Sequence, residues 1–278
     1  MSLGRIGLIL VALALLGMAG AALFVRLGVY NVAATAQHTA PVFWLLQRGL
    51  EYSIRQRADG IAAPDLEDRA LAERGFRHYH LHCVQCHGAP GVARHDLGKG
   101  MLPLPSNLVQ TAREWTASEI FWTIKHGIKM SGMPGWDYRM DDDDIWAITA
   151  FVRRLPYVAP ADYRAMAARL EADPGGTSEE GEMTLKGDPD RGQVAIRQYG
   201  CTACHTVPGV VGPNATVGPP LRGMATRMYI AGVLPNTPEN MILWLRNPVE
   251  VDPLTGMPDL DVKAGHARDM AAYLETLD

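Results

Sequence analysis

The chain has 278 residues and a formal net charge of −4, from 26 basic and 30 acidic side chains. This near-neutral balance provides no basic surface for nucleic acid, so we exclude nucleic acid as a partner. The sequence has no Gly-rich nucleotide loop before a strand, no Ser-His-Asp set and no paired carboxylates that stand out. Strand-like alternation is almost absent, and we therefore expect an all-α fold.

The first predicted element is an uncharged, mostly apolar run between Arg5 and Arg26. As a helix, residues 6–25 would span about 30 Å, the thickness of a hydrocarbon core. A cleaved signal peptide is the alternative, because Arg5 precedes the run and residues 19–21 are small. The run is longer than a usual signal-peptide core, so we predict a retained transmembrane anchor over residues 1–28.

An apolar stretch, residues 29–62, follows the anchor. Its segment 41–57 begins with proline, a favourable first helical residue. The apolar residues on one side of this predicted helix are Phe43, Leu46, Leu50 and Ile54. Three interpretations stay open: the helix packs on the domain that follows, lies in the membrane interface, or docks on a partner protein.

Two copies of a Cys-x-x-Cys-His motif use every cysteine of the chain. The copies are Cys83, Cys86 and His87, and Cys201, Cys204 and His205. In haem c attachment, both thiols bond to the vinyl groups of one porphyrin and the histidine ligates the iron. Zinc would need four ligands in one cluster, and a redox dithiol would need a βαβ context, so these alternatives are weaker. The motifs predict two haems c, each held by two thioether bonds.

The motifs also orient the chain. Haem c is attached outside the cytoplasmic membrane, so the segment after the anchor belongs on the periplasmic side. We expect a single-pass protein of the inner membrane whose N-terminus lies inside the cell.

The sequence after residue 62 repeats itself. Each copy has a helix before the motif, a Gly- and Pro-rich stretch, a helix with tryptophan, a Gly-Met-Pro triplet and an amphipathic C-terminal helix. A tandem duplication accounts for this order. We predict one domain over residues 63–160, a linker over 161–187 and a second domain over 188–278. Residues 173–182 are poor in apolar side chains, which is typical of a flexible linker.

Beside its histidine, each iron has either a sixth ligand or an open face, and 13 methionines are available as ligands. Met133 and Met257 each follow a glycine that permits close backbone approach and precede a proline that stiffens the loop. A thioether ligand favours Fe(II) and raises the reduction potential. We therefore predict that Met133 completes the His87 site and that Met257 completes the His205 site. The rival ligands in the first domain are Met130, Met101 and Met140.

With these features, residues 65–156 and 188–278 both resemble class I cytochrome c domains. In that family a Gly-Pro-x-Leu segment packs against the proximal histidine. Gly218-Pro-Pro-Leu221 matches it, so the resemblance implies that the carbonyl of Pro219 orients His205. The first domain has Leu102-Pro-Leu-Pro-Ser-Asn107 instead, and leaves open whether Pro103 or Pro105 orients His87.

Two tryptophans occupy matching places in the copies. The resemblance implies that the indole N–H groups of Trp122 and Trp244 contact the haem propionates. Plain core packing is the alternative.

The segment 29–34, with His38 and Trp44, resembles membrane-anchored c-type cytochromes of proteobacterial respiratory chains. Two irons with His/Met ligation can pass single electrons but cannot easily bind peroxide or oxygen. We predict a non-catalytic, dihaem electron-transfer subunit that is anchored in membrane lipid. It would take electrons from a redox protein and pass them to a respiratory membrane complex, with a terminal oxidase favoured. The alternatives are a dihaem peroxidase-like reductase with one exchangeable axial site and an assembly subunit with structural haems.

Overall fold

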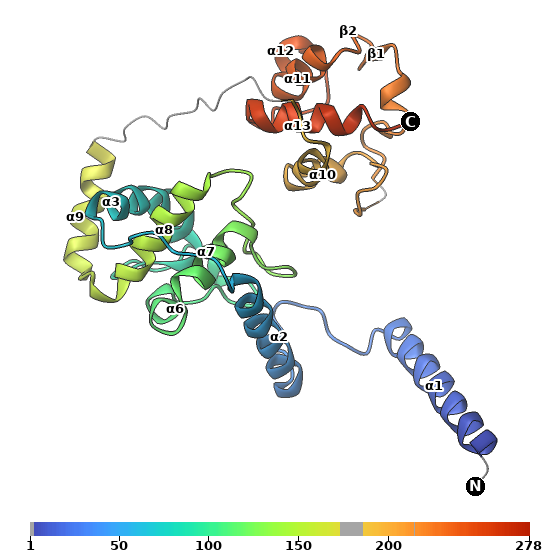
Figure 1. The fold of residues 1–278 in the computed structure, drawn as a ribbon, viewed down its shortest axis with the longest axis horizontal. Coiled ribbons are helices and arrows are strands. Elements are labelled where there is room, and N and C mark those ends of the chain that lie inside the picture. The colour runs from blue at the N-terminus through green and yellow to red at the C-terminus, as the bar shows by residue number, and fades with distance from the viewer. Residues whose placement is uncertain (1–2, 173–185, 214) are drawn as a thin grey trace. The chain divides into compact units, whose positions relative to one another are not determined.

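The structure, a computed structural model, describes residues 3–172, 186–213 and 215–278. The chain divides into two compact units, residues 1–173 and 174–278 (Figure 1). In the described residues, the regular secondary structure is helical apart from one pair of two-residue strands in the second unit. The expected all-α character is confirmed.

The chain begins with α1, Leu3–Arg26, in which no residue is buried. Among the described residues it is the one helix long and apolar enough to cross a membrane, a test that a signal sequence also passes. Residues 27–39 lead to α2, Ala40–Ala58, which has Pro41 in its first turn. The predicted anchor and the helix after it are therefore both helical.

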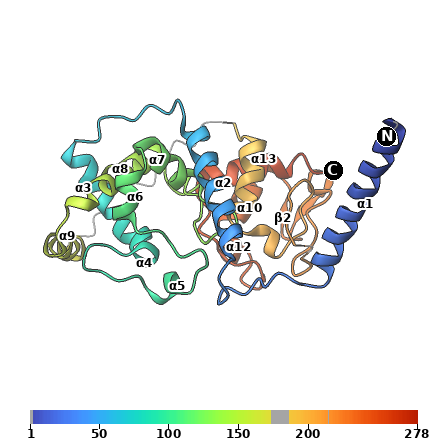
Figure 2. The ribbon, with the colours of Figure 1, turned by 90° about the horizontal axis from the view of Figure 1, so that it is seen from below.

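The first unit is built around two crossing helices. Its helices after α2 are α3, Arg69–His78; α4, Val84–His87; α5, Asp96–Lys99; α6, Leu108–Glu114; α7, Ala117–His126; α8, Asp142–Arg154; and α9, Pro160–Ala172. A π-helical turn, Tyr79–Cys83, joins α3 to α4. Helix α8 is buried along most of its length, and α3 packs across it. Figure 2 shows α4 and α5 at the lower edge of this unit.

Helix α9 differs from the prediction, which placed a linker from residue 161. Tyr163 of α9 is 1% exposed. Its ring centroid lies 5.5 Å from that of Phe76, and its hydroxyl lies 3.1 Å from Nδ1 of His80. Because α9 covers the first core, this domain extends beyond its predicted boundary at residue 160. The predicted flexible segment, residues 173–182, lies outside the described residues.

The second unit repeats the crossing pair with different helices. Its elements are α10, Pro189–Gln198; 3₁₀ turns Cys201–Ala203 and Met224–Thr226; β1, Tyr229–Ile230; β2, Leu234–Pro235; α11, Pro238–Arg246; α12, Pro248–Val251; and α13, Ala264–Leu274. The strands pair antiparallel, with Tyr229 opposite Pro235. Helices α10 and α13 pack against each other as α3 and α8 do in the first unit.

Candidate haem c centres

The chain enters the first motif through the π-helical turn after α3. Cys83 ends this turn and packs against the first core, and Cys86 and His87 follow within α4. Single π-helical turns are frequent at functional sites. In the second unit a 3₁₀ turn begins at Cys201, directly after α10 and the left-handed Gly200. Both motifs therefore follow the N-terminal helix of a crossing pair.

None of the four cysteines forms a disulfide. Burial, with a smaller contribution from Cys86, raises the pKa of the Cys83 thiol to about 12. Burial likewise raises the pKa of the Cys201 thiol to about 11. Both thiols are therefore neutral near pH 7.

The imidazole of His87 is fixed by a main-chain carbonyl. Its Nδ1 lies 2.9 Å from the carbonyl oxygen of Ser106, so the Nδ1–H group donates and Nε2 is left to bind a metal. Burial lowers the pKa of His87, although the hydrogen bond to Ser106 opposes this shift. The neutral form, which ligates metals, is therefore favoured.

The residue that orients His87 is neither of the two considered from the sequence. The carbonyl oxygen of Pro105 instead accepts a hydrogen bond from Nη2 of Arg94, at 2.8 Å. Asn107 caps α6 and turns the chain immediately after Ser106. The question that the sequence left open is answered by Ser106, because the proline positions alone do not say which carbonyl faces the ring.

The second histidine has the contact that the family resemblance implies. Nδ1 of His205 lies 2.7 Å from the carbonyl oxygen of Pro219. The backbone approaches so closely that a β-carbon at Gly218 would lie 2.4 Å from Cε1 of His205. Glycine is the residue that lets this segment pass along the imidazole.

The two carbonyls share a local sequence pattern. Ser106 and Pro219 each stand two residues before a leucine, Leu108 or Leu221. This x-x-Leu spacing was the available signal for Ser106.

Each predicted methionine ligand lies in a loop closed by a hydroxyl group. The N–H of Met133 donates to Oγ of Ser131 at 3.1 Å, and the N–H of Met257 donates to Oγ1 of Thr255 at 3.2 Å. Both methionines are half-buried. Sequence reasoning missed the two hydroxyl residues, although both loops read Ser/Thr-Gly-Met-Pro.

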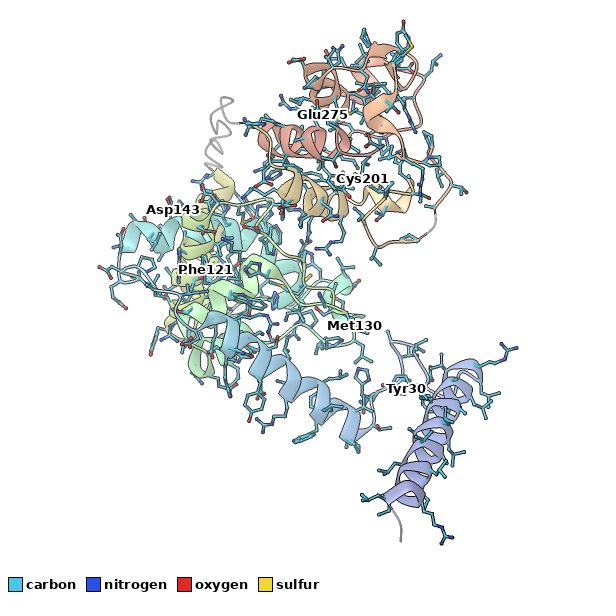
Figure 3. The ribbon with its side chains drawn as sticks, turned by 45° about the vertical axis from the view of Figure 1, so that its right-hand side comes forward. Tyr30, Phe121, Met130, Asp143, Cys201 and Glu275 are labelled. Carbon is cyan, nitrogen blue, oxygen red and sulfur yellow. The ribbon has the colours of Figure 1, made fainter. Side chains whose placement is uncertain are left out.

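The rival methionines of the first domain lie in three different environments. Met130 is 98% exposed at the edge of the unit (Figure 3). Met140 is buried in the core. Met101 lies beside the Met133 loop, because a β-carbon at Gly132 would sit 2.6 Å from its Sδ. Met101 is therefore a rival whose thioether lies against the Met133 loop.

A cavity of about 380 Å³ lies next to His87, and residues that line it include Tyr79, Arg94, Lys99 and Leu108. Met133 is not one of its lining residues. Nε of Arg94 is buried and has no hydrogen-bond partner within the described residues. A buried cationic donor without an acceptor fits a ligand that carries carboxylates, as haem does. The thiols, the available Nε2 and this donor together fit haem c.

The two tryptophans differ in burial. Trp244 is buried in the second core, and Trp122 is half-buried with its ring centroid 4.9 Å from that of His126. Contact with haem propionates remains a prediction for both.

Comparison with known proteins identifies the first domain. Residues 70–152 match the family model described as cytochrome c oxidase, cbb3-type, subunit III. This segment, which contains Cys83, Cys86, His87 and Met133, is a cytochrome c domain, and such a domain implies covalently bound haem c. The matched residues end before the second unit begins.

A curated relative also lies among respiratory oxidase subunits. The chain is 27% identical over 167 residues to cytochrome c oxidase subunit 2 of Alkalihalophilus pseudofirmus. The alignment covers 56% of this chain and 47% of the relative, so the chain spans about half the length of that protein. No solved structure matches the chain.

Proposed function

We propose that the chain is a membrane-anchored dihaem cytochrome c that relays single electrons within or to a respiratory membrane complex, with a terminal oxidase favoured. One observation carries the dihaem assignment. In both units the motif histidine has Nδ1 within hydrogen-bond distance of a main-chain carbonyl oxygen, that of Ser106 or Pro219. Two separate centres thus present Nε2 in the same manner, and each has its own pair of motif cysteines outside any disulfide.

A haem c bound at each centre would supply a one-electron couple. Cys83 and Cys86 would hold the first group, and Cys201 and Cys204 the second. The carbonyls of Ser106 and Pro219 fix the rotation of the two imidazoles. Ser131 and Thr255 hold the loops that carry Met133 and Met257, the proposed sixth ligands. With both axial positions filled, each centre suits electron relay better than the binding of a small substrate.

The proposed location follows from α1 and from the chemistry of attachment. Helix α1 would anchor the chain in the inner membrane, and both haem domains would lie in the periplasm. The similarity to cbb3-type subunit III and to an oxidase subunit 2 supports an oxidase as the partner. A periplasmic redox protein would supply the electrons.

The test is an optical redox titration of the purified, haem-loaded full chain, followed by exposure of the reduced protein to carbon monoxide. We expect two low-spin centres with positive potentials and weak carbon monoxide binding. Strong binding at either centre would contradict relay through two closed sites and favour a peroxidase-like reductase. Extraction of a tagged chain in mild detergent tests the partner: an oxidase should co-purify, and its absence would remove the proposed assignment to that complex.

A further inference from the structure

The first two turns of α2 are apolar on every side and exposed. Phe43, Trp44, Leu45 and Leu46 are between 54% and 64% exposed. Successive residues of a helix point about 100° apart, so four consecutive apolar side chains surround the helix. Figure 1 shows this end of α2 extending away from α3, α6, α7, α8 and α9. A helix that is apolar all round is normally buried in protein or lipid.

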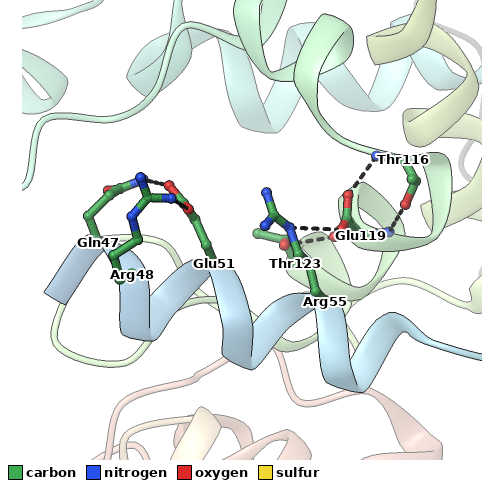
Figure 4. A network of polar contacts seen from close by, with 7 residues as sticks. All are labelled: Gln47, Arg48, Glu51, Arg55, Thr116, Glu119 and Thr123. Atoms are coloured by element: carbon green, nitrogen blue, oxygen red, sulfur yellow. Dashed lines mark hydrogen bonds and ion pairs between the residues drawn. The ribbon is translucent and has the colours of Figure 1, made fainter. Parts of the chain in front are cut away.

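The remainder of α2 carries polar and charged side chains that form hydrogen bonds and an ion pair. Nε2 of Gln47 donates to Oε1 of Glu51 at 3.0 Å, and Nη1 of Arg48 donates to Oε2 of Glu51 at 2.9 Å (Figure 4). One helical turn later, Nε of Arg55 lies 3.6 Å from Oε1 of Glu119 on α7. The apolar and polar parts of α2 therefore succeed each other along the helix axis.

The polar part is also the part that packs. Ile54 and Ala58 are buried where α2 meets α7. Oγ of Ser118, in α7, donates to the carbonyl oxygen of Ile61 at 2.8 Å. These contacts hold the C-terminal half of α2 on the first domain while its N-terminal half remains uncovered.

The connection to α1 limits where the uncovered end can be. Residues 27–39 could span at most about 45 Å when fully extended. The segment is shorter than that, because the hydroxyl of Tyr30 and Nδ1 of His38 form a hydrogen bond and the two rings stack. If α1 is the anchor of the proposed function, on which this inference rests, the start of α2 lies near the membrane surface.

We infer that residues 40–46 insert into the outer part of the lipid bilayer, and that Gln47, Arg48 and Glu51 remain at the level of the headgroups. Tryptophan and leucine at the tip suit the boundary between headgroups and acyl chains. The polar triad directly behind the tip suits water and headgroups. Through the packing of α2 on α7, this second attachment would fix the orientation of the first haem domain toward the membrane.

The test places a nitroxide spin label at either of two positions on one face of α2. Leu45→Cys and Gln56→Cys are about 20° apart around the helix and three turns apart along it. Both positions are exposed. The haem-loaded full chain would be studied in nanodiscs that contain phospholipid and no other protein. Relaxation of each label by oxygen, which concentrates in lipid, is compared with relaxation by a water-soluble nickel complex.

We expect the ratio of oxygen to nickel accessibility to be several-fold higher at position 45 than at position 56. If both labels are equally accessible to nickel, insertion into lipid is overturned, and the tip is left as a surface for a protein partner. A third label, Leu16→Cys in α1, separates the two proposals. If position 16 is oxygen-accessible and position 45 is not, the anchor stands and this inference fails. If position 16 is itself nickel-accessible, the anchor fails and this inference fails with it.

Discussion

Gly75 of α3 packs directly on the backbone of Ala147 in α8. A β-carbon at Gly75 would lie only 1.8 Å from the carbonyl oxygen of Ala147. The second unit has the same relationship, because a β-carbon at Gly192 of α10 would lie 2.0 Å from the carbonyl oxygen of Asp269 in α13. In each unit a glycine lets the helix before the motif cross its partner helix, α8 or α13, at backbone contact.

We predict that Gly75→Ala destabilises the first domain by about 2 kcal/mol or more, because a rigid backbone atom occupies the space. Gly49→Ala is the control: nothing lies within 4 Å of that position in α2, so alanine should be neutral or slightly stabilising. Denaturant unfolding of the full chain, followed by circular dichroism, measures both. Equal stability of the two variants would show that the helices do not cross at Gly75.

A second prediction concerns Gly218, whose absent side chain leaves room for His205. In Gly218→Ala the new β-carbon would overlap the imidazole, displacing it from the iron. We expect a high-spin signal from the second centre in electron paramagnetic resonance, with an unchanged first centre. Gly265→Ala, where the nearest neighbour is an ordinary 3.7 Å away, should retain two low-spin signals. Two low-spin signals in Gly218→Ala would mean that the backbone does not pass along the ring as described.

The hydroxyls of the methionine loops give a third prediction. Removing one neutral hydrogen bond costs about 1 kcal/mol. Thr255→Ala should therefore weaken methionine ligation at the second centre, and exogenous imidazole should bind the ferric protein about fivefold more tightly. Thr255→Ser, which keeps the hydroxyl, should bind imidazole like the unchanged protein. If the serine variant behaves like the alanine variant, the methyl group rather than the hydrogen bond supports the loop.

Replacing Met133 tests the sixth ligand of the first centre. Met133→Ala should open the iron, so that the reduced protein binds carbon monoxide strongly, and should lower the potential of that centre. Met130→Ala should change neither property, because Met130 is 98% exposed. Carbon monoxide binding after Met101→Ala, but not after Met133→Ala, would show that Met101 is the sixth ligand.

The crossing helices and both motifs could be predicted because their signals are local. Helical periodicity marks the helices, and contiguous residues form each Cys-x-x-Cys-His motif. The carbonyl of Ser106 could not be identified with the same certainty, because every residue has a carbonyl and only the folded loop decides which one faces His87. The prolines pointed to Pro103 and Pro105 as candidates instead.

Helix α9, in contrast, could have been predicted, because the sequence contains the apolar spacing of a buried helix face. Tyr163, Met166, Ala167 and Leu170 have the i, i+3, i+4, i+7 spacing of one helix face, and all four belong to the first core or pack against it. The segment was assigned to the linker because it lies between the two repeated units. The packing of the C-terminal half of α2 on the domain had no comparable signal, because apolar residues occur in both the packed and the exposed part of the helix.

The central claim is that this chain carries two haems c, one in each unit. The most direct test is the intact mass of the mature full chain, produced in a host that attaches haem c, after treatment with a thiol-alkylating reagent. We predict the mass of the polypeptide plus two haems, with no alkylated cysteine. A mass with one haem and two alkylated cysteines, located at Cys201 and Cys204 by peptide mapping, would contradict the claim and leave a single haem domain.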